Sequence, residues 1–261
     1  MIEFSNVAIV VSHPAHLLTV AGLIQRHHPA ILASSSADSS DAGNQARIIK
    51  AGLMQLGCQT APSFLDVDER EAYQWAHVGH WAPFLKIRER LLEWIYEVRP
   101  DVVLGDAFEC SNYMHDVGRL LLDSALHEYR KEQPQVRNFE FPLVCRPTSE
   151  PDKLRFQFFP SGELEEFILT ESEAARKLEI IEWALPQSEF IRNVAPLFPP
   201  IHIEPLRAIP WDRDYTKIPE GVEKHYDARG VEMVNSGTYD KPIRFEEHFV
   251  PLVKEITMAG L

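Results

Sequence analysis

The sequence predicts an α/β fold, a mostly parallel sheet with flanking helices and a small antiparallel β addition. Two strand–loop–helix units predict it. An apolar strand at Val7–Val11 runs directly into a helical pattern, and a second strand at residues 101–105 leads through a loop into a helix over about 115–131. Helical patterns lie between these strands, and a strand, a crossover helix and a strand in that order form a parallel, right-handed unit. We therefore expect a Rossmann-like sheet.

Apolar spacing and turn residues place the other elements of this sheet. The pattern predicts strands at residues 30–34 and Ser63–Val67, and helices at 45–56, 68–80 and 83–98. A serine-rich loop over 34–41 separates the second strand from the helix that follows it. These elements alternate along the chain, as they do in a sheet with helices on both faces.

The pattern changes after Pro134. Residues 138–146 and 154–159 predict an antiparallel pair, and 163–169 predict one more strand. Thr170 with Glu173 has the spacing of a capping box, which opens a helix through Ala184. The rest reads as an extended proline-rich segment over 196–210, an irregular segment over 215–240 and a closing helix over 243–256.

Composition narrows the class of protein. The chain has 261 residues and a formal net charge of −13, with no basic cluster that would suit a nucleic acid or an anionic membrane. No apolar run reaches the ~18 residues of a membrane span, and we expect no signal peptide. The three cysteines form no CxxC pair, which indicates reduced thiols in the cytoplasm. We expect a small-molecule substrate. The sequence leaves open whether the chain forms a homo-oligomer.

Two histidines, His13 and His16, lie on the turn between the first strand and the first helix. Ligands of open α/β sheets bind at this edge, outside the carboxyl ends of the strands. His115 starts the helix of the second unit, which brings it to the same edge if both strands are central. Imidazole is the commonest metal-binding side chain. The alternative is structural, with the pair capping the first helix and His115 lying on the surface.

At these residues the chain resembles the PIG-L/LmbE family of metal-dependent N-deacetylases. The family's HPDDE motif corresponds to His-Pro-Ala-His-Leu at residues 13–17, and its later HxxH-type motif to residues 112–115. Residues 98–104, 170–189 with Gln187, and Phe245–Phe249 resemble further family segments in the same order. The resemblance implies a single LmbE-like α/β domain over 1–261, in which 134–261 add β structure and irregular loops that cover the site.

The resemblance also assigns roles, and the chain departs from several of them. It implies that His13 and His115 are metal ligands, and it places His16 where the family has an aspartate ligand. Ala15 stands in the place of the aspartate that acts as general base. Leu17 replaces the glutamate, and Asn112 replaces the first histidine of the later motif.

A set of His13, His16 and His115 would offer three neutral nitrogens and an open position, which is the general form of a catalytic zinc site. Such a site can lower the pKa of a bound water to ~7 and depends less on a base. Asp106 and Glu109, which lie at the same edge, are candidate catalytic replacements for the base, and we favour Asp106 because it ends a strand. His248 is a candidate acid or oxyanion donor.

The resulting hypothesis is a zinc-dependent hydrolase that acts on an N-acyl amino sugar or a related small amide through a metal-bound water. A catalytically altered or inactive relative that binds a small molecule or a partner is the alternative, because three motif positions have lost their chemistry. Ester or lactone hydrolysis on the same metal site is a third hypothesis. A nucleotide-sugar transferase is a fourth, weakened because Gly22, Gly43 and Gly52 form no phosphate-binding loop.

Overall fold

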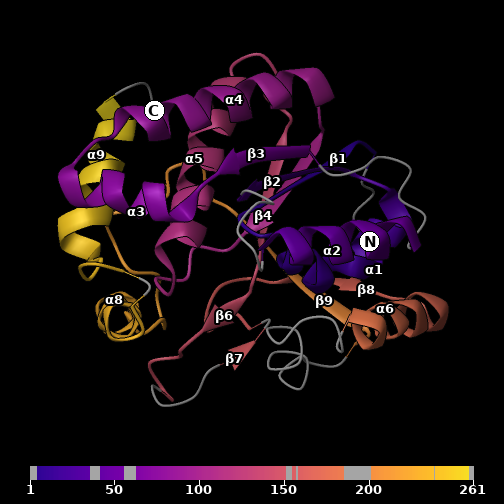
Figure 1. The fold of residues 1–261 in the computed structure, drawn as a ribbon. Coiled ribbons are helices and arrows are strands. Elements are labelled where there is room, and N and C mark those ends of the chain that lie inside the picture. The colour runs from indigo at the N-terminus through magenta and orange to yellow at the C-terminus, as the bar shows by residue number, and fades with distance from the viewer. Residues whose placement is uncertain are drawn as a thin grey trace.

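A single mixed sheet forms the centre of the molecule (Figure 1). The computed structural model describes residues 5–35, 42–55, 63–150, 155–156, 158–184, 201–237 and 239–258. Within them the sheet has the strand order β3-β2-β1-β4-β5-β9-β8. Its strands are β1 (Val7–Val11), β2 (Ala30–Ser35), β3 (Ser63–Val67), β4 (Val102–Asp106), β5 (Arg137–Phe141), β8 (Glu165–Ile168) and β9 (Ile203–Ala208). The first five in spatial order are parallel, and β9 runs antiparallel to both of its neighbours.

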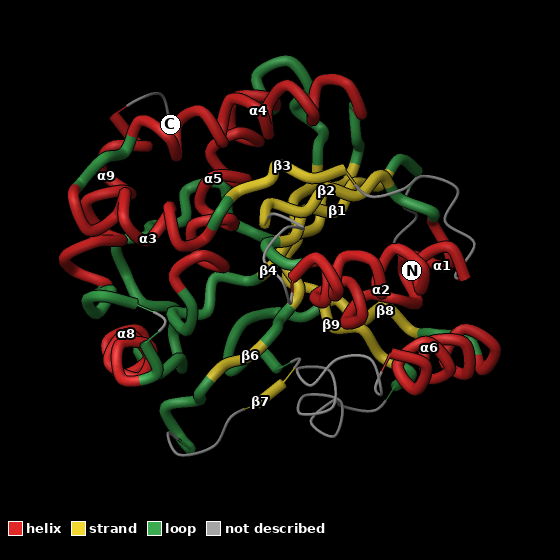
Figure 2. The backbone as a smooth tube through the Cα atoms, viewed as in Figure 1, coloured by secondary structure: helices red, strands yellow, loops and turns green. Residues whose placement is uncertain are grey.

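Helices cover both faces of the sheet (Figure 2). One layer contains α1 (Ala21–His27), α2 (Ala42–Gln55) and α6 (Glu171–Ala184); the other contains α3 (Glu69–Val78), α4 (Ala82–Val98), α5 (Tyr113–Tyr129) and α9 (Val250–Met258). Alternate residues of β1 face the two layers. Ile9 joins the core beneath α1 and α6, and Val10 joins the core beneath α4 and α5. This alternation explains why β1 reads as an uninterrupted apolar run.

The predicted α/β fold is confirmed, together with its order of elements up to α5. The first helix differs in form, because a 3₁₀ segment (Pro14–Val20) precedes α1. The predicted capping box is also confirmed, since Thr170 N donates to Glu173 Oε2 at 2.8 Å and Glu173 N donates to Thr170 Oγ1 at 3.3 Å.

Three expectations for the second half of the chain need correction. The expected antiparallel pair is confined to β6 (Val144–Cys145) and β7 (Arg155–Phe156), while β5 pairs parallel with β4 in the main sheet. Part of the segment expected to be irregular forms α8 (Tyr226–Asn235). The closing helix consists of a π-helical turn (Phe245–Phe249) followed by α9. Gln187, which contributes to the family resemblance, falls outside the described residues.

A buried ion pair anchors the helix that follows the two histidines. Lys177 Nζ lies 2.7 Å from Glu204 Oε1, and both side chains are fully buried. The Glu204 carboxylate also accepts hydrogen bonds from the N–H groups of Gly22 and Leu23, at 2.8 and 2.9 Å. Because the first N–H groups of a helix lack partners within it, a carboxylate at this end stabilises the helix. The pair therefore ties the first turn of α1 to β9 and α6.

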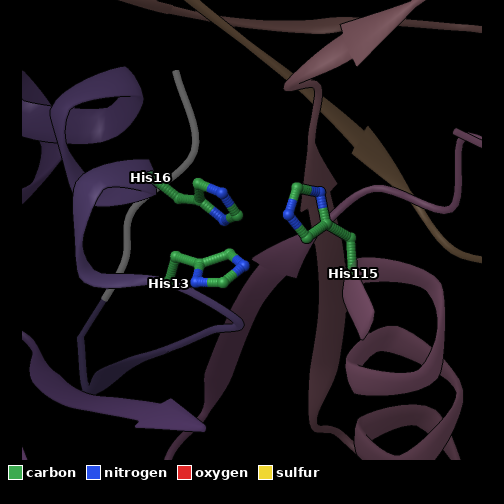
Figure 3. Close-up of side chains that lie close together, drawn as sticks. All are labelled: His13, His16 and His115. Atoms are coloured by element: carbon green, nitrogen blue, oxygen red, sulfur yellow. The ribbon is translucent and has the colours of Figure 1, made fainter. Parts of the chain in front are cut away.

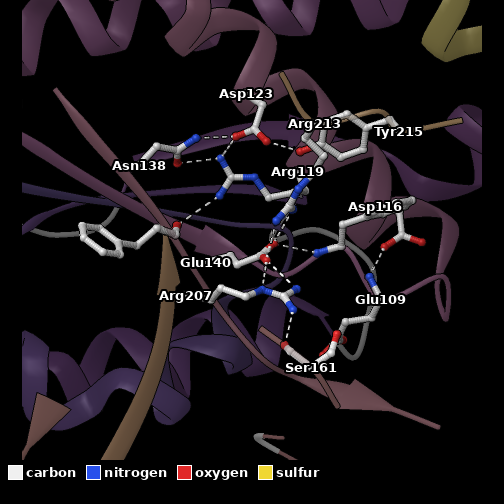
Figure 4. Close-up of polar contacts among 12 residues, drawn as sticks. Glu109, Asp116, Arg119, Asp123, Asn138, Glu140, Ser161, Arg207, Arg213 and Tyr215 are labelled. Atoms are coloured by element: carbon white, nitrogen blue, oxygen red, sulfur yellow. Dashed lines mark hydrogen bonds and ion pairs between the residues drawn. The ribbon is translucent and has the colours of Figure 1, made fainter. Parts of the chain in front are cut away.

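A second buried ionic network joins β5 to β9 and to the chain that follows β9 (Figure 4). Glu140 is fully buried, and its carboxylate accepts hydrogen bonds from Arg207 at 2.7 Å and from Arg213 at 2.7 Å. Burial alone would raise the pKa of Glu140, but the two guanidinium groups lower it to about 2. A neighbouring set of polar contacts joins α5, β5 and the chain after β9, and it consists of Arg119, Asp123, Asn138 and Tyr215.

Among the helices described, none combines the length and the apolar character that crossing a membrane requires.

Candidate metal centre

His13 and His16 are held together by a tight turn at the end of β1. His13 is the last extended residue, and Pro14 begins the 3₁₀ segment with its backbone angle already restricted. The His16 N–H donates to the His13 carbonyl at 3.1 Å. A 3₁₀ helix has three residues per turn, so residues three apart lie on one side of it. The turn therefore directs both imidazoles to the same side.

His115 reaches the same edge of the sheet from the first turn of α5. The Asn112 side chain caps this helix by accepting a hydrogen bond from Met114 N at 2.9 Å. Gly118 allows α5 to approach the end of β1, since a Cβ atom there would lie 2.7 Å from Ser12 Oγ. Helix capping and close packing thus place His115 opposite the two histidines that follow β1.

The three imidazole rings face one another across a small gap (Figure 3). Their centroids are 5.1 Å apart for His13 and His16, 5.1 Å for His13 and His115, and 4.5 Å for His16 and His115. One nitrogen of each ring can be chosen so that all three lie within 4.8 Å of one another. Among the described residues, these three histidines form a group whose donor atoms lie close enough together to hold a metal ion.

The surroundings of His115 favour its neutral form, which is the form that binds a metal. Burial, with His16 and His13 as neighbours, holds the pKa of His115 well below its usual value. His115 is therefore neutral at pH 7, which is the form that binds a metal. For His13, burial alone would lower the pKa, but the Glu69 carboxylate raises it above the usual value.

Asp106, the favoured candidate for the base, is in contact with His16. It ends β4, and its Oδ2 atom lies 2.9 Å from His16 Nδ1 and accepts a hydrogen bond from Ser12 N at 2.7 Å. Burial opposes ionisation of Asp106, but His16 and the Ser12 N–H lower its pKa. With Nδ1 of His16 occupied in this way, Nε2 is the nitrogen available to a metal. A carboxylate that orients a ligand histidine is a common partner of zinc sites.

Replacing Asp106 by asparagine is expected to weaken zinc binding by about 10- to 100-fold, the usual cost of removing such a partner. The shape of the side chain is kept, but the charge that orients His16 is lost. Competition with a chromophoric zinc chelator measures the affinity. Asp101→Asn, an exposed change just before the other end of the same strand, is the control. Equal affinities in both variants would contradict the orienting role.

The other two candidate catalytic residues make contacts elsewhere. Glu109 is buried and accepts hydrogen bonds from Leu143 N at 2.8 Å and Val144 N at 2.9 Å. Burial outweighs these donors and raises its pKa to about 8. His248 accepts a hydrogen bond from Arg244 N at 2.9 Å. Its ring packs against that of His77, with 5.0 Å between the ring centroids. The catalytic roles of Glu109 and His248 stay predictions.

Sequence reasoning missed one carboxylate at this site. Glu69 is the first residue of α3, and its Oε1 atom lies 2.9 Å from His13 Nε2. Burial would raise the pKa of Glu69, but His13 lowers it, so the carboxylate is ionised. The available signal was an acidic residue at the start of a helix directly after a predicted strand, at the ligand-binding edge of the sheet.

The departures from the family motif have structural roles here. Leu17 joins the core beneath α1, and Ala15 is buried. Asn112 caps α5, as described above. None of these three positions offers an ionisable group to the histidines.

Fold and site together define an α/β protein with a three-histidine cluster at the carboxyl edge of its sheet. No protein-family model and no curated protein matches the sequence. Solved structures do match. A40926 pseudoaglycone deacetylase Dbv21 aligns with 81% of this chain and 100% of its own, at a TM-score of 0.51 and 15% identity. A deacetylase from the teicoplanin biosynthesis pathway aligns with 80% of this chain and 100% of its own, at a TM-score of 0.51 and 11% identity. The resemblance to the LmbE-like deacetylases is thus confirmed for the fold.

Proposed function

We propose that the chain is a zinc-dependent hydrolase of the deacetylase type, which cleaves an N-acyl amino sugar or a related small amide. The observation that carries the proposal is the cluster of His13, His16 and His115, whose ligand nitrogens lie within 4.8 Å of one another. The deacetylase fold of the two solved structures supports the reaction class.

The donor set fits zinc better than the harder cations. Imidazole nitrogens suit zinc, whereas Mg²⁺ and Ca²⁺ prefer oxygen ligands. Three protein ligands leave a fourth position open, as in catalytic zinc sites. Zinc bound there would supply a Lewis acid that polarises the amide carbonyl and lowers the pKa of water to ~7.

The residues around the zinc site divide the remaining tasks. Asp106 orients His16 through the 2.9 Å contact with its Nδ1 atom. The helix cap at Asn112 holds the first turn of α5, which carries His115. His13 is half-buried, so the space between the rings lies close to solvent and to an incoming substrate.

The test combines metal analysis with a substrate screen. Tag-free protein purified without chelator should contain about one zinc per chain. It should release acetate from one or more members of a panel of N-acetylhexosamines and 4-nitroacetanilide, and His115→Ala should abolish that turnover. His16 contacts the buried Asp106 carboxylate, whereas within the described part of the chain no ion pair joins His115 to a carboxylate, so this variant should stay folded.

The competing hypotheses give different results in the same experiment. An inactive relative would show no zinc even after zinc is added, and no turnover. Cleavage of 4-nitrophenyl acetate but of no amide, with the same dependence on His115, would establish ester hydrolysis instead. Zinc binding with no turnover of either class would contradict the proposed hydrolase.

A further inference from the structure

Glu69 is an acidic side chain in contact with His13 to which the proposed function assigns no task. It starts α3 directly after Asp68, which caps the helix by accepting a hydrogen bond from Glu71 N at 3.0 Å. The cap holds the backbone of the first turn of α3, which carries Glu69. Its Oε1 atom lies 2.9 Å from His13 Nε2, and Tyr73 donates a hydrogen bond to its Oε2 atom at 3.4 Å.

The second observation is the absence of a carboxylate from the turn that carries the two histidines. That turn has Ala15 between His13 and His16, and Ala15 is buried. Hydrolysis of an amide gains about 10²- to 10⁴-fold from a positioned base. A carboxylate from another element would have to reach the rings through space, and Glu69 does so from the carboxyl end of β3.

We propose that Glu69 is the general base of the hydrolase, supplied by α3 in place of the turn after β1. This assignment rests on the proposed hydrolase function. It makes the site a composite of three strand ends, with His13 and His16 after β1, His115 after β4 and Glu69 after β3.

The other carboxylates near this edge are less suited to the role. Asp106 has 2% of its side chain exposed, and its Oδ2 atom is already shared by His16 and Ser12. Glu109 is buried, and each of its oxygens accepts a backbone hydrogen bond. The oxygens of Glu69 also have partners, in His13 and Tyr73, but 30% of its side chain is exposed, so it can contact water and substrate as well.

The step assigned to Glu69 balances without any further reactant. The Glu69 carboxylate takes one proton from water while the water oxygen bonds to the amide carbonyl carbon. Glu69 then gives this proton to the amine nitrogen as the carbon–nitrogen bond breaks. The products are a carboxylic acid and a free amine, and Glu69 returns to its ionised form.

The test compares Glu69→Gln with Glu71→Gln, an exposed change in the same first turn of α3. For the panel amide that the wild-type protein cleaves, kcat of Glu69→Gln should fall about 10²- to 10⁴-fold with little change in KM. Glu71→Gln should match the wild type. Zinc content per chain and the visible absorption spectrum of the cobalt-substituted protein should be the same in all three, because a base leaves the metal ligands unchanged.

Each other outcome has one meaning. A kcat of Glu69→Gln within about threefold of the wild type overturns the assignment and leaves the hydrolase function standing. Loss of zinc or an altered cobalt spectrum in Glu69→Gln would make Glu69 a metal ligand or an orienting partner of His13, and either result also overturns the assignment. If circular dichroism shows that Glu69→Gln is unfolded, Glu69→Asp takes its place in the test. The assignment then predicts a fall in kcat of Glu69→Asp at unchanged zinc content. A wild-type protein that binds zinc but cleaves no amide overturns the hydrolase function, and the assignment fails with it.

Discussion

Replacing His16 by asparagine is expected to leave the protein folded but without bound zinc and without hydrolase activity. The asparagine amide can still donate a hydrogen bond to Asp106, which His16 Nδ1 contacts at 2.9 Å. It offers no imidazole nitrogen to the metal, and two remaining histidines do not complete a zinc site. The zinc content measured by elemental analysis should fall from about one zinc per chain to none.

His16→Ala should have a further effect on stability. It leaves the Asp106 carboxylate, 2% exposed, without its imidazole partner. Removal of one member of a buried pair typically costs about 3–5 kcal/mol. The two variants therefore separate metal binding from folding. His80→Ala, an exposed change, should keep both zinc and stability.

Thermal unfolding with added zinc gives an independent measurement. A ligand at 100 times its Kd stabilises the folded state by about 2.7 kcal/mol. Zinc should raise the melting temperature of the wild type and of His80→Ala, but not that of His16→Asn. About one zinc per chain in His16→Asn would show that His16 is not a ligand.

Replacing Glu140 by glutamine is expected to destabilise the folded state by about 3 kcal/mol at pH 7. Arg207 and Arg213 would keep their charges, 14% and 15% exposed, without the carboxylate that lies between them. The shift in the pKa of Glu140 on folding corresponds to a stabilisation of the same size. A fall from 4.5 to about 2 on folding corresponds to about 3 kcal/mol of stabilisation at neutral pH.

The pH dependence of this effect has a defined sign. Because folding lowers the pKa of Glu140, its contribution is fully present above about pH 4.5 and is lost as the pH falls through about 2. The stability difference between wild type and Glu140→Gln should therefore be about 2 kcal/mol smaller at pH 3 than at pH 7.

Urea unfolding at several pH values measures this difference. Glu128→Gln is the matched control, since it removes a surface ion pair with Lys131 that is worth less than about 1 kcal/mol. A Glu140→Gln variant as stable as Glu128→Gln at pH 7 would contradict the stabilising role of the network.

Local pattern was enough to predict the first half of the fold and the three histidines. The apolar run of β1 ends at Val11, just before Ser12 and His13, and a helical pattern follows, so the turn could be located from sequence alone. The same reasoning located β4 and the start of α5, and parallel topology then brings His115 to the edge that carries His13. Each inference used residues close together in the chain.

Pairing between distant segments could not be predicted in this way. The residues of β5 have a pattern that suits either a hairpin or a central strand, and only packing against β4 decided between them. The same holds for Asp106, which the sequence placed at the correct edge. Its contact with His16, 90 residues away in the chain, appears only in the folded structure.

By itself, then, the sequence determined the α/β class, the turn that presents His13 and His16, and the second unit that presents His115. The tertiary structure alone decided that the three rings meet, that Asp106 contacts His16, and that Glu69 reaches His13 from α3. The physical reason is that hydrophobic period and capping are local properties of the chain. A contact such as that of Glu69 with His13 depends on how far two strands lie apart in the sheet and on the direction in which a helix begins.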